Sequence, residues 1–169
     1  AAVSRPGVPR RALLLALLLP LRAAAADALP RGWSLVDPDG AFRATSLQES
    51  CGSPRGLLLA SRGPTSAHAT VVQRFLATPY LGQRLRLSAT ASARGVKDWA
   101  GVWMRVDGPD PDRSLAFDNL QDRPLTGTQP CRGVELVLDV PAQARSITAG
   151  VLLEGEGAVE LPSLRFEPV

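Results

Sequence analysis

The fold of this chain is decided by a stretch of strict alternation, Arg84-Leu-Arg-Leu-Ser-Ala-Thr-Ala91, in which polar and apolar side chains take turns. Successive side chains of a β-strand point to opposite faces, so this pattern predicts a strand with one buried and one solvated face. The same alternation recurs over Val102 to Val106, Val134 to Val140 and Ile147 to Leu153, whereas helical periodicity is hard to find after residue 27. The sequence therefore predicts an all-β domain.

Shorter apolar runs complete the set of predicted strands, at residues 33–36, 42–47, 57–60, 71–76, 115–117 and 164–166. Glycine- and proline-rich turns separate them, as in Asp37-Pro-Asp-Gly40. About ten short strands without intervening helices predict a two-sheet antiparallel sandwich of the jelly-roll type. We expect its core to contain Leu85, Leu87, Val102, Met104, Val106, Leu136, Leu138, Val151 and Phe166.

The first 26 residues have the order of a secretory signal peptide. Arg10 and Arg11 precede an apolar run over residues 12–21, and Arg22 is followed by an alanine tract. This run is far shorter than the roughly 20 residues that a membrane span needs. We expect cleavage after Ala26 or Ala28. The product is a single domain over residues 27–169, without a membrane anchor, in the periplasm or secreted.

The charge of the chain is concentrated in this leader. The whole sequence has a net charge of +3, but residues 27–169 carry 15 basic and 16 acidic side chains, a net charge of −1. A nearly neutral domain lacks the positive surface that attracts a phosphate backbone or anionic lipid. We therefore expect no nucleic-acid partner.

Cys51 and Cys131 are the two cysteines of the chain. In an oxidising compartment such a pair is more often a disulfide than a metal site. Two unpaired thiols are the alternative. His68 is the only histidine, so the ligands of a closed zinc site are missing, and we expect neither a metal nor a cofactor.

Six segments of the mature chain carry a family resemblance: Phe75 to Ser88, Trp99 to Gly108, Leu115 to Thr128, Val137 to Pro141, Gly150 to Gly155 and Leu164 to Glu167. Over these segments the chain resembles a bacterial domain that is appended to secreted serine peptidases of the C-terminal-processing type and to some AraC-type regulators, and that also occurs alone. The resemblance implies a jelly-roll fold of the galactose-binding-like type, similar to carbohydrate-binding modules, without an established activity.

The chain departs from this family at three places. Cys131 and Glu160 stand where the resemblance leads us to expect tryptophans. Pro162 and Ser163 replace an acidic pair that helps to hold a structural calcium in related sandwiches. Losing these residues removes hard oxygen ligands. The departures argue against a calcium site and against a sugar platform at those positions.

Trp99 and Trp103 are the candidates for an aromatic binding platform. Trp103 and Arg105 alternate with Val102 and Met104, so we expect them on the face opposite the core. A tryptophan there can stack on a sugar ring or on a side chain of a partner. The alternative is that Trp103 packs against the other sheet or beneath a loop.

Asp118, Asn119 and Asp122 add short polar groups after the predicted strand at 115–117. If that strand forms a hairpin with residues 102–106, these groups lie beside the strand that carries Trp103. Together with Trp103 and Arg105 they form a candidate ligand site. The alternative is that the Asp and Asn side chains only cap their own loop.

Catalytic patterns are missing from the sequence. His68 is the only imidazole, and there is neither a Gly-x-Ser-x-Gly elbow nor a phosphate-binding loop. We therefore expect an exported, non-catalytic module that binds carbohydrate or another cell-envelope ligand. A periplasmic protein-interaction or scaffold domain is the alternative, and a small sandwich lyase or hydrolase is the third interpretation.

Overall fold

The computed structural model describes residues 28–169, so the predicted leader at 1–26 lies outside the described part. A single turn of 3-10 helix, η1 (Thr78–Tyr80), accompanies ten strands. The strands are β1 (Trp33–Val36), β2 (Phe42–Leu47), β3 (Gly56–Ser61), β4 (His68–Leu76), β5 (Gln83–Asp107), β6 (Ser114–Asp118), β7 (Leu125–Val140), β8 (Ser146–Glu154), β9 (Ala158–Leu161) and β10 (Leu164–Pro168). The described residues contain no helix long and apolar enough to cross a membrane.

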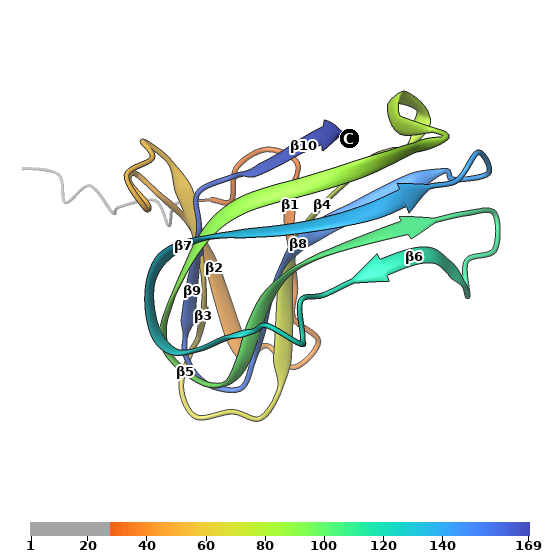
Figure 1. Ribbon diagram of the computed structural model, residues 1–169. Coiled ribbons are helices and arrows are strands. Elements are labelled where there is room, and N and C mark those ends of the chain that lie inside the picture. Colours follow the sequence, from red (N-terminus) through yellow and green to blue (C-terminus); the bar gives the residue numbers. More distant parts are fainter. Residues whose placement is uncertain (1–27) are drawn as a thin grey trace, which may run out of the picture.

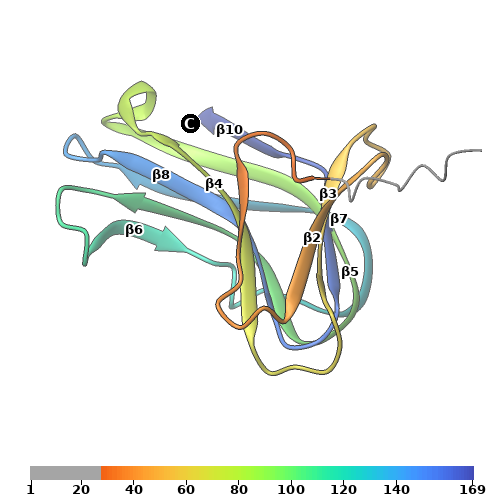
Figure 2. The ribbon, with the colours of Figure 1, turned by 180° about the vertical axis from the view of Figure 1, so that it is seen from behind.

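The strands form two antiparallel layers, which confirms the predicted sandwich. One layer has the order β1-β4-β8-β5-β6, with the second half of β5 at residues 99–107. The other layer joins β2, β3 and β9 to the first half of β5, which also pairs with β10 and β7. Figure 1 shows β5 running along one layer, turning, and returning in the other. Figure 2 shows β1 beside β4 and β2 beside β3 from behind.

The turn of β5 lies between Ala91 and Ala100, where its pairing with β7 shifts register three times and the strand changes layers. Gly95 in this stretch has a φ of 59°, a left-handed conformation that costs little for glycine and more for residues with a Cβ. Irregular pairing of this kind bends a strand and increases its local twist.

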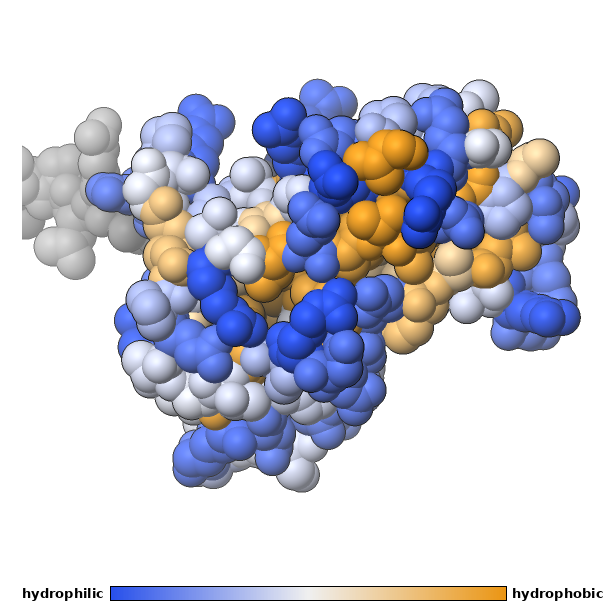
Figure 3. All heavy atoms as spheres, in the orientation of Figure 1, coloured by the Kyte–Doolittle hydropathy of each residue, from blue (hydrophilic) through white to orange (hydrophobic). Residues whose placement is uncertain are grey.

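The predicted core is present between the layers. Leu85, Leu87 and Leu136 from one layer and Val102, Met104, Val106 and Val151 from the other are all at most 2% exposed. Leu138 and Phe166 are only partly buried but pack against the same cluster. Figure 3 shows apolar side chains reaching the surface over β7, between clusters of hydrophilic ones.

Two strands are much longer than the sequence predicts. The alternation at 84–91 and that at 102–106 belong to one strand, β5, and β7 begins at Leu125 rather than near Val134. The added residues lie along the bend of β5 and combine exposed polar side chains with buried apolar ones, among them Val96, Ala100 and Leu125. As a result Cys131, which we expected just before a strand, lies within β7.

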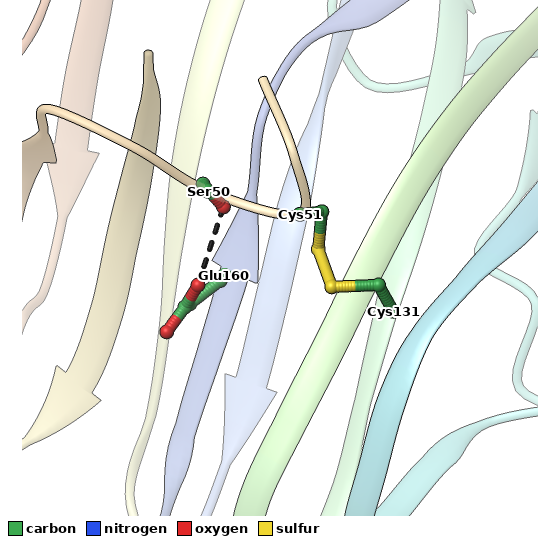
Figure 4. Close-up of a disulfide and its surroundings, with 4 residues drawn as sticks. All are labelled: Ser50, Cys51, Cys131 and Glu160. Atoms are coloured by element: carbon green, nitrogen blue, oxygen red, sulfur yellow. Dashed lines mark hydrogen bonds between the residues drawn. A yellow bond between two sulfur atoms is a disulfide. The ribbon is translucent and has the colours of Figure 1, made fainter. Parts of the chain in front are cut away.

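A disulfide joins Cys51, in the loop after β2, to Cys131 on β7 (Figure 4). The two Cα atoms are 5.6 Å apart and the residues are 80 positions apart in the sequence. Next to the bridge, the buried Ser50 donates a hydrogen bond of 3.2 Å from Oγ to Glu160 Oε2 on β9. Cys131 and Glu160, the positions at which the family resemblance suggested tryptophans, thus hold the β2–β3 loop against the sheet.

Truncating Leu87 or Leu136 to alanine should lower the free energy of unfolding by about 2–5 kcal/mol, because each removal leaves a cavity in a packed core. Leu76→Ala is the matched control, since Leu76 is 71% exposed and should change stability by less than about 0.5 kcal/mol. Urea denaturation measures both. A loss below about 1 kcal/mol at both core positions would contradict the described register.

The double variant Cys51→Ser, Cys131→Ser should be less stable than the oxidised protein by about 4 kcal/mol, because the disulfide closes a long loop in the unfolded chain. The same variant and the reduced native chain should unfold at similar urea concentrations. Two titratable thiols in protein purified without reductant would show that the bridge does not form.

Candidate functional site

The outer face of the β1-β4-β8-β5-β6 layer carries exposed and half-buried aromatic side chains. Along β5, Trp99, Gly101, Trp103, Arg105 and Asp107 point away from the core, in alternation with buried residues. Phe117 of β6 pairs with Arg105 in the register of the sheet and lies on the same side. We call the surface formed by Trp99, Trp103 and Phe117 the aromatic face.

Trp103 lies along the surface of the sheet. It pairs with Gly150 of β8, which in turn pairs with Val72 of β4. Its Nε1 nevertheless donates a 2.8 Å hydrogen bond to Thr70 Oγ1 on β4. Because neighbouring strands are about 4.8 Å apart, the indole must cross β8 to reach this partner. At Gly150 itself an added Cβ would overlap the Val71 carbonyl oxygen, so no larger side chain fits there.

Trp99 is positioned by a second glycine and a carboxylate. Its Nε1 donates a 2.6 Å hydrogen bond to Glu154 Oε2 on the neighbouring strand β8. A Cβ added at Gly101 would lie 3.0 Å from the Trp99 ring and 2.7 Å from the Asn119 carbonyl oxygen. The ring therefore packs over the bare backbone of position 101.

Phe117 is the functional candidate that the sequence analysis missed. Its side chain is 51% exposed, and its ring centroid lies 6.3 Å from that of Trp103 at an interplanar angle of 54°. In the sequence Phe117 belongs to a short apolar run, so it resembled a core residue. Its alternation with Ala116, opposite the buried Val106, was the signal that could have placed it outside.

Arg105 lies on the aromatic face but is already paired. Its Nε is 2.8 Å from Asp107 Oδ1 and its Nη2 donates a 3.2 Å hydrogen bond to Asp107 Oδ2. This bidentate pairing neutralises the guanidinium and fixes its plane. Arg105 thus supplies a rigid polar border to the face rather than a free charge.

Asp118, Asn119 and Asp122 lie beside the Trp103 strand, as the predicted β5–β6 hairpin requires. Asp118 Oδ1 accepts a 2.8 Å hydrogen bond from Leu120 N, and Asn119 Oδ1 accepts one of 3.1 Å from Gln121 N. These two side chains therefore cap their own turn, the alternative that the sequence left open. Asp122 is held by Arg123, whose Nη1 lies 2.9 Å from both carboxylate oxygens.

Of the five predicted ligand-binding residues, the structure thus brings only Trp103 and Arg105 onto the aromatic face. The polar atoms of Asp118, Asn119 and Asp122 are bonded to partners within the loop. Within residues 28–169 no group of three or more His, Cys, Asp or Glu side chains gathers as a metal site would require. The face thus consists of two indoles whose N–H groups are hydrogen-bonded and the exposed ring of Phe117, an arrangement that can stack on a ring-shaped ligand.

The outer face of the opposite layer has a different character. Arg84 pairs with Asp139 at 3.1 Å, and Arg86 pairs with both Glu135 and Glu167 at 3.3 and 3.2 Å. These pairs are largely solvent-exposed and connect β5 to its neighbours β7 and β10. This layer presents a solvated, self-paired surface without an aromatic platform.

No family model matches the chain. A curated relative is an uncharacterized HTH-type transcriptional regulator, YbfP, of Bacillus subtilis strain 168, which is 46% identical over 101 residues. The match covers 60% of this chain and 34% of the regulator. The chain thus spans about a third of the length of that relative.

Solved structures with the same fold include carbohydrate-binding modules. The CBM22-1 xylan-binding domain of Paenibacillus barcinonensis Xyn10C superposes with a TM-score of 0.57 at 14% identity, covering 85% of this chain and 90% of the module. A family 61 module, TmCBM61, solved in complex with β-1,4-galactotriose, superposes with a TM-score of 0.53 at 12% identity, covering 82% and 90%. At such identities the likeness concerns the fold, and it confirms a jelly-roll like that of carbohydrate-binding modules.

Asp118→Ala should lower the free energy of unfolding by about 1 kcal/mol, because Leu120 N loses its acceptor while Leu120 remains in a left-handed conformation, φ 55°. It should leave any ligand binding unchanged, since the carboxylate is used within the turn. Thermal unfolding and a binding isotherm on the same sample measure both effects. Lost ligand binding with unchanged stability would show that Asp118 belongs to the ligand site.

Proposed function

We propose that this domain is an exported, non-catalytic binding module whose aromatic face holds a carbohydrate chain, such as a glycan of the cell envelope. The observation that carries the proposal is the position of Trp103. The indole is held along the sheet surface by its hydrogen bond to Thr70 and is only partly buried, so part of the ring is accessible to a ligand. A pre-positioned ring binds a sugar face without the entropy cost of ordering a mobile side chain.

The distribution of the rings favours an extended ligand over a single sugar. The backbone positions of Trp99 and Trp103 are four residues apart on one strand, roughly 13 Å at the rise of a β-strand. Phe117 continues the surface sideways onto β6. Three rings on two neighbouring strands favour a ligand longer than a single sugar unit.

The comparisons support this proposal in two ways. Modules of the same fold include one described as xylan-binding and one solved with β-1,4-galactotriose. The similarity to part of a transcriptional regulator supports a unit that can be joined to a larger protein, while the link to peptidases stays a prediction from the resemblance. In this proposal residues 27–169 are the mature unit, located in the periplasm or secreted.

Trp103→Ala should weaken binding to a recognised glycan about tenfold or more, because it removes a central aromatic contact. Phe117→Ala should weaken it less, and Trp103→Phe should retain part of the affinity because a ring remains. Leu81→Ala is the control, since Leu81 is exposed but lies in the turn after η1. The measurement is a glycan array that includes xylohexaose and β-1,4-galactotriose, followed by calorimetry.

Circular dichroism of each variant separates lost binding from lost fold. Full glycan affinity in a folded Trp103→Ala protein would contradict the proposal. Failure to bind any glycan, together with specific capture of an envelope protein that Phe117→Ala abolishes, would favour the protein-interaction alternative.

A further inference from the structure

Arg74 stands at one end of the aromatic face without a carboxylate partner. It belongs to the outward row of β4, and its Nε and Nη2 donate hydrogen bonds of 3.1 and 2.8 Å to the single hydroxyl of Ser146. Ser146 is 6% exposed, so this contact holds the guanidinium against the floor of the sheet. Among residues 28–169 no carboxylate lies within ion-pair distance of Arg74, and its positive charge and remaining N–H donors stay available.

A groove at this end of the face is lined by Arg74, Phe75, Leu76, Arg145 and Ser146. It therefore contains a second guanidinium, that of Arg145. Within the described part of the chain the Arg145 side chain makes neither an ion pair nor a hydrogen bond, while its backbone N–H is bonded to the Asp107 carbonyl oxygen. The groove therefore offers two uncompensated positive charges beside the exposed apolar side chain of Leu76.

The carboxylate nearest in register does not neutralise this end. Asp107 pairs with Ser146 across β5 and β8, but its two oxygens are bound by Arg105 and its side chain is only 16% exposed. Another acidic group, Glu154, lies at the other end of the face, where it accepts the hydrogen bond of Trp99. The positive charges of Arg74 and Arg145 thus stay without a carboxylate partner at this end.

Thr148 adds a hydroxyl without a hydrogen-bond partner between Arg74 and Arg105. In the register of the sheet it lies between Arg74 on β4 and Arg105 on β5. It is 7% exposed, and its Oγ1 has no hydrogen-bond partner. Buried hydroxyls are usually hydrogen-bonded, so the Thr148 hydroxyl marks a place where a ligand can supply the missing hydrogen-bond partner.

Resting on the proposed function, we infer that the ligand is an acidic glycan, whose sugar carboxylates bind Arg74 and Arg145 while neutral parts of the chain stack on the aromatic face. Guanidinium groups bind carboxylates through paired hydrogen bonds that neutral hydroxyls cannot match. Trp103 and Arg74 occupy adjacent rows of the outer face, so one chain reaches both. The net charge of −1 over residues 27–169 disfavours a polyanion of nucleic-acid density.

The test compares acidic oligosaccharides with the same molecules after their carboxyl groups have been reduced to alcohols. The probes are xylo-oligosaccharides with a glucuronic acid branch, hexagalacturonate and a hyaluronan hexasaccharide. For at least one of them the acidic form should bind about tenfold more tightly than its reduced form, as a charge-assisted pair predicts, and the difference should shrink with added salt.

The double variant Arg74→Gln, Arg145→Gln should lose this preference and keep the affinity for the reduced form. Arg84→Gln is the matched control, because Arg84 is an equally exposed arginine on the other layer. Equal affinity for acidic and reduced forms, a preference that survives the double variant, or binding restricted to neutral glycans would overturn the inference.

These outcomes separate the inference from the proposed function. Neutral binding that depends on Trp103 without a preference for acidic chains would refute only the inference. Absence of binding to every acidic and neutral probe would refute both, and acidic binding that is unaffected by Trp103→Ala would remove the aromatic face from the site.

Discussion

The backbone hydrogen bonds along β5 hold both layers of the sandwich together. One continuous strand pairs with β7, β9 and β10 before its bend and with β8 and β6 after it. The alternation of β5 therefore points Leu85 and Leu87 into the core from one layer and Val102 and Met104 from the other. The register shifts at the bend change which residues face the core, from odd-numbered ones before it to even-numbered ones after it, so Trp99 and Trp103 point outward. The core and the aromatic face therefore lie on opposite sides of the same strand.

The aromatic face depends on the residues around the rings as well as on the rings themselves. Bare backbone at Gly101 leaves space over which the ring of Trp99 packs, and the indole of Trp103 lies across β8 to reach Thr70. The polar residues next to it are mostly committed to partners, since Arg105 is bound to Asp107 and the hairpin loop caps itself. The unpaired guanidinium groups and the unsatisfied hydroxyl of Thr148 lie at the Arg74 end. The chemistry of the surface therefore differs along its length.

Alternation alone was enough to predict the core, the outward side of Trp103 and the hairpin that brings Asp118 beside it. Three features were out of reach because they depend on pairing between distant segments. The bond from Trp103 to Thr70 spans 33 residues, and that from Arg74 to Ser146 spans 72. The long β5 was missed since its bend is made of small and polar residues, which look like a turn when read without the partner strand β7.

The order of strand pairing also limits when the domain can fold. β10, near the end of the described chain, pairs with the beginning of β5, and the central β8 pairs with β4, which lies about seventy residues or more before it in the sequence. Contacts of such long range form slowly, because loops must close before any of them stabilises the chain. A nascent chain that ends before residue 164 leaves one edge of β5 without its neighbour. The first half of β5 thus has all of its neighbours only when residues 164–168 are present to pair with it.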